Sequence, residues 1–137
     1  MNLSKTSEYA IRLLLYLSLH PDRKVTTREL NSQLQLSFKY IGRLLSKLVN
    51  AGIISSEKGK TGGYTLTRSP QEIKLIEIIR VVDDWDKYTQ CMMGFGDCNE
   101  NNPCAMHDVW TPVRNQLIEL FEATTVQDLI IHMHEKV

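Results

Sequence analysis

The 137-residue sequence has no apolar run near the roughly 20 residues that a membrane-spanning helix needs, and no repeated or low-complexity segment. The apolar stretch over residues 11–19 contains Arg12 and runs into Pro21 without a small-residue cleavage site. This pattern is not that of a signal peptide. We therefore interpret the stretch as a buried helix of a cytoplasmic protein that has no membrane partner.

Cysteine is scarce and catalytic motifs are missing. The sequence has three cysteines, all between positions 91 and 104, and three thiols cannot all pair within one chain. We therefore expect no disulfide scaffold. Serine, histidine and aspartate are present, but no motif ties them into a nucleophile and its base, so we expect a protein that is not an enzyme.

The net charge is zero, but the charges are unevenly distributed. Residues 1–68 contain eleven basic and four acidic side chains, whereas residues 69–137 contain five basic and twelve acidic ones. A polyanion would be attracted to the first half and repelled by the second. At 42% hydrophobic residues the chain can bury one modest core, so we expect one compact unit completed by a second subunit.

The first half has the pattern of three helices followed by a β-hairpin. Ser4 is placed to cap a first helix, whose shared apolar face carries Ala10, Leu13, Leu14 and Leu17. Thr26 and Glu29 have capping-box spacing at the start of a short second helix. A third helix, from residue 37 to about residue 51, has a buried stripe formed by Ile41, Leu44, Leu45 and Leu48. Gly52 ends it, and strands over 53–56 and 64–67 flank a loop with three glycines and two lysines.

This order is that of a winged helix-turn-helix, so we predict a mainly α fold with a small β-hairpin wing and a long C-terminal dimerisation helix. The third helix has the diameter to enter a DNA major groove, and the wing brings backbone N–H groups and lysines close to phosphates. Tyr40 and Arg43 are expected to reach base edges. The candidate DNA-binding residues are Ser37, Lys39, Tyr40, Arg43, Lys47, Lys58, Gly59 and Lys60. A glycine-rich nucleotide-binding loop is followed by a helix, whereas the wing glycines are followed by a predicted strand. This order argues against a nucleotide-binding loop.

After a predicted helix over residues 72–82, the chain enters a polar loop that holds all three cysteines. The spacing is C-x6-C-x5-C-x2-H, formed by Cys91, Cys98, Cys104 and His107. Glycine, asparagine and proline between the thiols predict an irregular loop that can wrap a metal centre. Thiolates suit zinc or an iron–sulfur cluster. The spacing leaves open a cluster, a structural zinc site on three cysteines and one histidine, and three buried cysteines without a metal.

Three segments together resemble the Rrf2 family of bacterial transcription regulators: residues 3–10, the wing at 59–64, and the cysteine loop. The resemblance covers nearly the whole chain. It implies a homodimer with an N-terminal winged helix-turn-helix and an iron–sulfur cluster bound by Cys91, Cys98 and Cys104. The state of that cluster is implied to alter binding to a double-stranded DNA operator, as in a repressor that senses redox conditions, iron–sulfur status or nitric oxide.

The resemblance offers two candidates for the fourth cluster ligand. One branch of the family has a histidine where His107 stands and a two-iron two-sulfur (2Fe-2S) cluster. Another has an acidic residue where Glu8 stands, contributed by the other subunit to a four-iron four-sulfur (4Fe-4S) cluster. Cys104 and His107 would share one face of a helix, so we favour His107 and the 2Fe-2S form.

This sequence departs from the histidine branch at two places. The gap between Cys91 and Cys98 is one residue longer, which affects the path of the loop. Gly42 stands where that branch has an acidic residue used in operator discrimination, so its operator preferences are not transferred to this chain.

The last part of the sequence is predicted to form the dimer. Thr111 and Pro112 suit the start of a helix, whose apolar stripe is Val113, Leu117, Leu120 and Phe121. The resemblance implies that two such helices pair across a twofold axis, which predicts a pseudo-palindromic operator and recognition helices roughly 34–36 Å apart. Thr125 should cap a last short helix, followed by exposed His132 and His134. The expected segments are a DNA-binding module (1–82), a cluster-binding loop (83–107) and a dimerisation region (108–137).

Two further functions stay open. A metal-free thiol switch would use the same cysteines through their oxidation. A small iron–sulfur electron carrier could bear three cysteines and a histidine as well. The carrier gives no reason for a basic wing.

Overall fold

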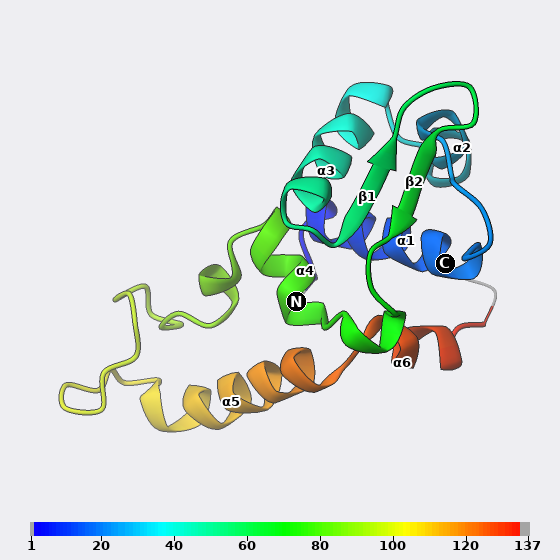
Figure 1. The fold of residues 1–137 in the computed structure, drawn as a ribbon. Coiled ribbons are helices and arrows are strands. Elements are labelled where there is room, and N and C mark those ends of the chain that lie inside the picture. The colour runs from blue at the N-terminus through cyan, green and yellow to red at the C-terminus, as the bar shows by residue number, and fades with distance from the viewer. Residues whose placement is uncertain (1, 135–137) are drawn as a thin grey trace.

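The computed structural model describes residues 2–134, and Figure 1 shows how their helices and strands are arranged. The elements are α1 (Lys5–Leu19), α2 (Thr27–Leu34), α3 (Phe38–Asn50), β1 (Ile54–Glu57), β2 (Gly63–Leu66), η1 (Pro70–Glu72), α4 (Leu75–Val82), η2 (Trp85–Tyr88), α5 (His107–Ala123) and α6 (Val126–Ile131). Helices with one antiparallel hairpin confirm the predicted fold class. Every helix in this part of the chain is too short or too polar to span a bilayer.

α1 lies at the centre of the N-terminal module and contacts α2, α4, α6 and β2. It begins at Ser4, whose side chain accepts a hydrogen bond from the Ser7 N–H, one of the donors that a helix start leaves unpaired. The predicted apolar face is buried as expected. Leu15 is also buried, because neighbouring elements cover α1 on more than one side.

α2 and α3 form the helix-turn-helix pair. Thr26 caps α2 by accepting from the Glu29 N–H at 3.1 Å, but the Glu29 carboxylate turns to Arg23 and Tyr16 and does not complete the capping box. Between the helices, Gln35 adopts a left-handed backbone with φ 56°. Ser37 then caps α3 by accepting from the Tyr40 N–H.

The wing is an antiparallel hairpin in the register Ile54↔Leu66 to Glu57↔Gly63. Tyr64 also pairs with Val25 through two backbone hydrogen bonds of 2.8 and 3.0 Å, which ties the wing to the segment before α2. The turn needs glycine at position 62, where a Cβ would overlap the Glu57 carbonyl oxygen.

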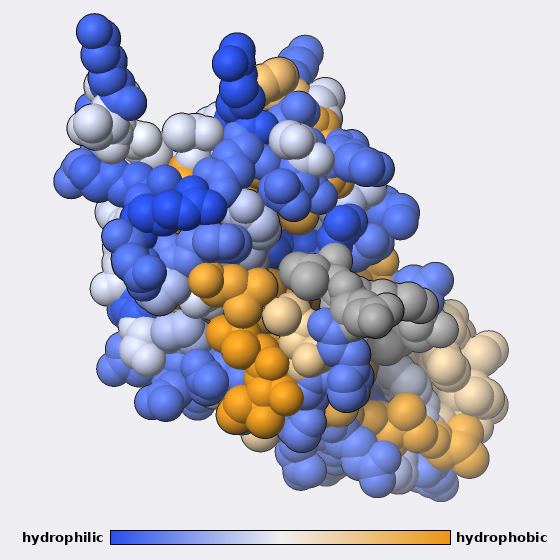
Figure 2. All heavy atoms as spheres, turned by 90° about the vertical axis from the view of Figure 1, so that its right-hand side faces the viewer, coloured by the Kyte–Doolittle hydropathy of each residue, from blue (hydrophilic) through white to orange (hydrophobic). Residues whose placement is uncertain are grey.

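Figure 2 shows a hydrophilic surface over the upper half of this side of the molecule, with apolar side chains gathered below.

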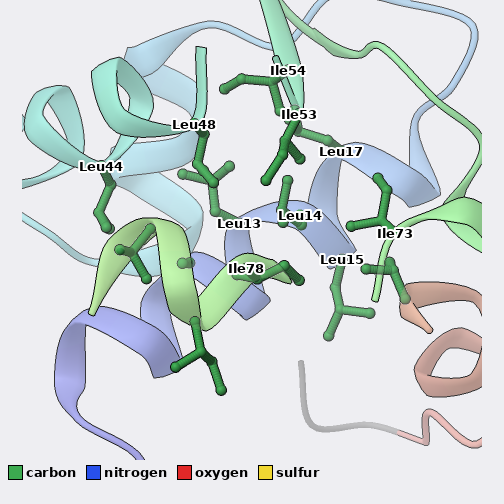
Figure 3. Packing of buried hydrophobic residues seen from close by; sticks show 14 of the residues in the cluster. Leu13, Leu14, Leu15, Leu17, Leu44, Leu48, Ile53, Ile54, Ile73 and Ile78 are labelled. Atoms are coloured by element: carbon green, nitrogen blue, oxygen red, sulfur yellow. The ribbon is translucent and has the colours of Figure 1, made fainter. Parts of the chain in front are cut away.

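The core joins α1, α3, α4 and the hairpin. Figure 3 shows that the following side chains surround one interior: Leu13, Leu14, Leu44, Leu48, Ile53, Ile54 and Ile78. The predicted stripe of α3 is fully buried in it. Because burial of each such side chain contributes about 1.5–3 kcal/mol, this interior holds the recognition helix firmly in the module.

The helix predicted over residues 72–82 is wrong in its first turn. Pro70–Glu72 forms the short η1 turn, and α4 begins only at Leu75. The cause is a backbone pairing with the far end of the chain: the Leu75 N–H donates to the Thr124 carbonyl at 3.0 Å, and the Val126 N–H to the Ile73 carbonyl at 2.9 Å. This pairing keeps Ile73 extended and attaches the end of α5 to the module.

α5 begins at His107, so the prediction of a helix start at Thr111 and Pro112 is wrong. Pro112 lies inside the helix, where it withholds one backbone donor. The turn before it is anchored by Trp110, whose indole N–H donates to the Gln90 carbonyl at 3.0 Å. This tertiary hydrogen bond stabilises a helical turn that the proline alone would disfavour.

The predicted apolar stripe of α5 divides between two environments. Phe121 is only 8% exposed and packs on Trp85 of η2, with ring centroids 5.1 Å apart. Leu117 is half-buried against the core. Val113 and Leu120 are each 53% exposed. The helix therefore uses one side of its stripe for its own module and leaves the other side uncovered.

Residues 89–106 contain no helix or strand, and Figure 1 shows them, in yellow-green, projecting from the module together with the start of α5. This confirms the predicted irregular loop. At the other end of α5, Thr125 caps α6 as predicted, and His132 and His134 are exposed.

Candidate DNA-binding face and cysteine cavity

α3 presents a row of basic side chains to solvent. Lys39, Arg43 and Lys47 recur every four residues, which places them on one face of the helix, and all three are exposed. Ser37, at the start of the helix, is exposed too. The structure therefore brings Lys39, Arg43 and Lys47 to one surface, with Ser37 exposed where the helix starts.

Tyr40, the fifth predicted residue on this helix, is half-buried and held by α1. Its hydroxyl lies 2.8 Å from the Thr6 Oγ1. Its ring and that of Tyr9 form a T-shaped pair, with centroids 5.8 Å apart and an interplanar angle of 79°. A base contact by Tyr40 would share its hydroxyl with Thr6. Inspection of the sequence missed this link because the two residues are 34 positions apart.

A groove of about 650 Å³ runs beside the basic face of α3. It is lined by Thr6, Lys39, Tyr40, Gly42, Arg43, Leu44, Ser46 and Lys47. Apart from the adjacent residues and the backbone of α3 itself, no heavy atom of the described residues lies within 4 Å of the position that a Cβ at Gly42 would take. The missing side chain at this position thus leaves the middle of the groove open.

The wing places Lys58, Gly59 and Lys60 at an exposed tip. Gly59 has a φ of +107°, in the region that favours glycine. The neighbouring carboxylate of Glu57 forms an ion pair with Lys24, which compensates its charge. The two exposed lysines and the nearby backbone N–H groups suit contacts to phosphate.

The three thiols approach one another unequally. Cys91 is buried, whereas Cys98 and Cys104 are half-buried. The Cys91 and Cys104 Sγ atoms lie 3.4 Å apart. The backbone N–H of Phe95, helped by that of Met93, lowers the pKa of the Cys91 thiol although burial opposes this, and the contact with Cys91 raises the pKa of Cys104. Cys91 is therefore the more readily deprotonated thiol of the pair.

A cavity of about 670 Å³ brings all three cysteines together with His107. The backbone N–H of His107 donates to the backbone carbonyl of Cys104 at 3.1 Å, so the main chain of these two predicted ligands is held together where α5 begins. Within residues 2–134, no three His, Cys, Asp or Glu side chains converge closely enough to hold a single metal ion. The donors instead surround a larger space, and sulfur with imidazole nitrogen is a donor set that fits an iron–sulfur cluster.

Glu8 is not among the residues that line this cavity. It lies in the first turn of α1, forms an ion pair of 3.0 Å with Lys5, and lines a separate pocket with Asn2 and Leu3. Glu8 would therefore reach a cluster only from a second subunit, as the family resemblance implied.

A hydrogen-bonded cluster that the sequence analysis missed joins α1 to the segment before Cys91. We call it the Asp83 node, and its members are Ser4, Ser7, Asp83, Lys87 and Tyr88. One Asp83 oxygen accepts from the Ser4 hydroxyl and, at 2.9 Å each, from the Ser7 and Tyr88 hydroxyls. The other accepts from Lys87 at 2.6 Å. Burial alone would raise the pKa of Asp83, but the hydrogen bonds from Lys87 and Ser4 outweigh it and hold the pKa well below its usual range.

Comparison with known proteins agrees with this architecture. The family model for Rrf2, described as an iron-dependent transcriptional regulator, matches residues 3–132. A protein of Aquifex aeolicus named as an HTH-type transcriptional regulator is 33% identical over 95% of this chain and 92% of its own length. The regulator NsrR of Shouchella clausii is 27% identical over 96% of this chain and 90% of its own. IscR of Vibrio cholerae is 28% identical over 96% of this chain and 76% of its own.

Solved structures share the fold. CymR of B. subtilis, the global cysteine regulator, superposes with a TM-score of 0.82 at 24% identity, covering 98% of this chain and 99% of its own. IscR of T. potens superposes with a TM-score of 0.77 at 23% identity, covering 99% and 94% of the two chains. These relatives are transcription regulators and not enzymes. The chain therefore belongs to the Rrf2 family of winged-helix transcriptional regulators.

Proposed function

We propose that this chain acts as a homodimeric regulator whose affinity for a pseudo-palindromic operator depends on an iron–sulfur cluster held by Cys91, Cys98, Cys104 and His107. The observation that carries the proposal is the single cavity lined by all four of these residues. They come from a 17-residue stretch of a chain in a family described as iron-dependent. Relatives named IscR and NsrR support the same assignment.

Operator binding is assigned to α3 and the wing. The exposed row of Lys39, Arg43 and Lys47 would lie along the major groove, with Arg43 near base edges. Lys58 and Lys60 would contact phosphates beside the groove. This division assigns sequence preference to α3 and much of the general affinity to the wing.

The second subunit is assigned to the uncovered side of α5. Val109, Val113 and Leu120 are spaced to fall on one face of the helix, and each is more than half exposed. Pairing of two such faces across a twofold axis would bury them. The twofold axis relates α3 of one subunit to α3 of the other. The two recognition helices would therefore contact half-sites roughly 34–36 Å apart.

The chemistry that a bound cluster supplies is reversible change of charge and ligation at iron, in response to oxidants, nitric oxide or iron supply. The residues of this chain would hold it, with thiolates from Cys91, Cys98 and Cys104. We favour His107 as the fourth ligand because it lines the same cavity, which suits the 2Fe-2S form. Glu8 of a second subunit is the alternative, with the 4Fe-4S form.

A thiol switch is the second candidate, favoured by the 3.4 Å separation of the Cys91 and Cys104 sulfurs. A peroxide could take two electrons from this pair, forming one S–S bond as the two thiol protons leave with the reduced peroxide oxygens as water. In this case the cavity would hold no metal, and operator binding would follow oxidation of the thiols alone.

Anaerobic purification, followed by visible absorption and by iron, acid-labile sulfide and zinc analysis on one sample, tests the assignment. We expect colour with matched iron and sulfide. His107→Ala should alter the spectrum and the iron count, whereas His132→Ala, at an exposed histidine outside the cavity, should not. Colourless protein with stoichiometric zinc would make the site structural, and metal-free protein with thiol-dependent operator binding would favour the second candidate.

A further inference from the structure

The Asp83 node lies between the two sites of the proposed function. It is built from residues far apart in the chain. Ser4 caps α1 and Ser7 lies in its first turn, whereas Asp83 precedes η2 and Tyr88 is the last residue of η2. The Ser4 N–H donates to the Tyr88 hydroxyl at 2.9 Å, which itself donates to Asp83. Ser7 is fully buried in this contact. The hydroxyl groups of Ser4, Ser7 and Tyr88 thus all donate to the Asp83 carboxylate, and these hydrogen bonds hold the start of α1 against η2.

On one side, η2 is linked directly to the cysteine cavity. Tyr88 stands three residues before Cys91, and the intervening backbone is tied back on η2, because the Gln90 N–H donates to the Asp86 carbonyl at 2.9 Å. The Gln90 carbonyl accepts from Trp110, one turn of α5 after His107. A displacement of either Cys91 or His107 would therefore act on Tyr88 through the short segment between Tyr88 and Cys91.

On the other side, α1 is linked to the recognition helix. Ser4 is followed two residues later by Thr6, whose hydroxyl lies 2.8 Å from that of Tyr40 on α3. Tyr9, one turn further along α1, packs edge-on against the same Tyr40 ring. A shift of the first turn of α1 would thus change the position of Tyr40, beside the groove on the basic face of α3.

We propose that the Asp83 node couples the state of the cysteine loop to the DNA-binding face, with Asp83, Tyr88 and Ser7 as positioning residues. The inference rests on the proposed function, since it explains how a change at the cysteines reaches α3. None of the three residues is assigned to the cluster or to DNA.

The test uses Tyr88→Phe, which removes the hydroxyl but keeps the ring that packs near Trp85 at a centroid distance of 6.0 Å. Tyr16→Phe is the matched control, because Tyr16 also donates a hydroxyl hydrogen bond to a carboxylate, Glu29, at 2.6 Å but outside the node. Operator affinity is measured for the cluster-loaded and the cluster-free form of each full-length protein. Circular dichroism and iron content establish that each variant folds and loads.

For the wild type and Tyr16→Phe, the two forms should differ in operator affinity by about 5- to 150-fold, the usual range of coupling between sites. For Tyr88→Phe the ratio should fall to within about twofold of one. If Tyr88→Phe loads no cluster, Ser7→Ala on α1 carries the same expectation. A wild-type ratio retained in a loaded node variant overturns this inference and leaves the proposed function intact. A wild-type ratio of one overturns both.

Discussion

Single residues in the DNA-binding face have separable tasks. Gly62 determines the shape of the wing, because only a residue without a Cβ avoids the Glu57 carbonyl. Lys60 contributes charge at the tip, and Arg43 contributes charge on the helix that would meet base edges. We therefore expect that shape, general affinity and sequence preference can be altered one at a time.

Gly62→Ala should distort the wing and lower the free energy of unfolding by about 1–3 kcal/mol, as expected when the backbone is forced from its preferred path. It should also weaken binding to any DNA. Gly42→Ala is the matched control, because open space surrounds that position in α3. Urea denaturation should show Gly42→Ala stabilised by about 0.4–1 kcal/mol. Equal stability of the two variants would contradict this account of the wing.

Lys60→Ala and Arg43→Ala should affect binding differently. Lys60→Ala should weaken operator and random DNA alike and reduce the slope of log affinity against log salt by about one. Arg43→Ala should cost about 1–3 kcal/mol on the operator and less on random DNA. Fluorescence anisotropy over a salt series measures both. The same losses on both DNAs for both variants would refute the division between α3 and the wing.

Among the elements, α1 and α2 are joined by a cluster around Glu29. Arg23 donates to one Glu29 oxygen at 2.8 Å and Tyr16 to the other at 2.6 Å. The hydrogen bond from Arg23 is the main reason that the pKa of Glu29 falls to about 2. Folding therefore favours the ionised carboxylate, and the cluster holds the first two helices of the module together.

This depressed pKa predicts an acid-dependent loss of stability. The contribution of Glu29 is present above the usual pKa of 4.5 and is lost as the pH falls towards about 2. Glu29→Gln should lower the free energy of unfolding at neutral pH by about 1 kcal/mol and lose less stability across that acid range than the wild type. Thermal unfolding from pH 7 to pH 2.5 measures this. Glu122→Gln, at an exposed position on α5, should follow the wild-type curve.

At the scale of the whole molecule, α5 is the helix that would contact a second copy in the proposed dimer. Its inner side is occupied by Phe121 and the half-buried Leu117, while Val113 and Leu120 remain uncovered in one chain. Because the cysteine cavity lies at the start of the same helix, the proposed dimer surface and the proposed cluster are close along the chain.

Leu120→Arg should therefore dissociate the dimer, because a charge at a buried interface position costs about 2 kcal/mol or more. Operator affinity should fall with it, since a monomer meets only one half-site. Glu119→Arg adds an arginine at the neighbouring exposed position, off the apolar face, and should remain dimeric. Analytical ultracentrifugation at several concentrations distinguishes the two. A dimeric Leu120→Arg protein would place the interface elsewhere.

Much of this protein is determined by the sequence alone. The buried faces of α1 and α3, the caps at Ser4, Thr26 and Thr125, the wing turn and the irregular cysteine loop were all predictable. Each depends on residues a few positions apart, through helical periodicity, hydrogen bonds to free N–H groups, or glycine at a tight turn. The charge asymmetry and cysteine spacing are likewise properties of the chain itself.

The tertiary structure decided the features that join distant residues. Ile73 is extended where it pairs with Val126, and α5 starts at His107, with its first turn stabilised by the hydrogen bond from Trp110 to Gln90. Asp83 gathers its partners from α1, 76 and 79 positions away. No local pattern encodes such contacts, since they exist only once the core has brought the elements together, and their hydrogen bonds then outweigh local preference.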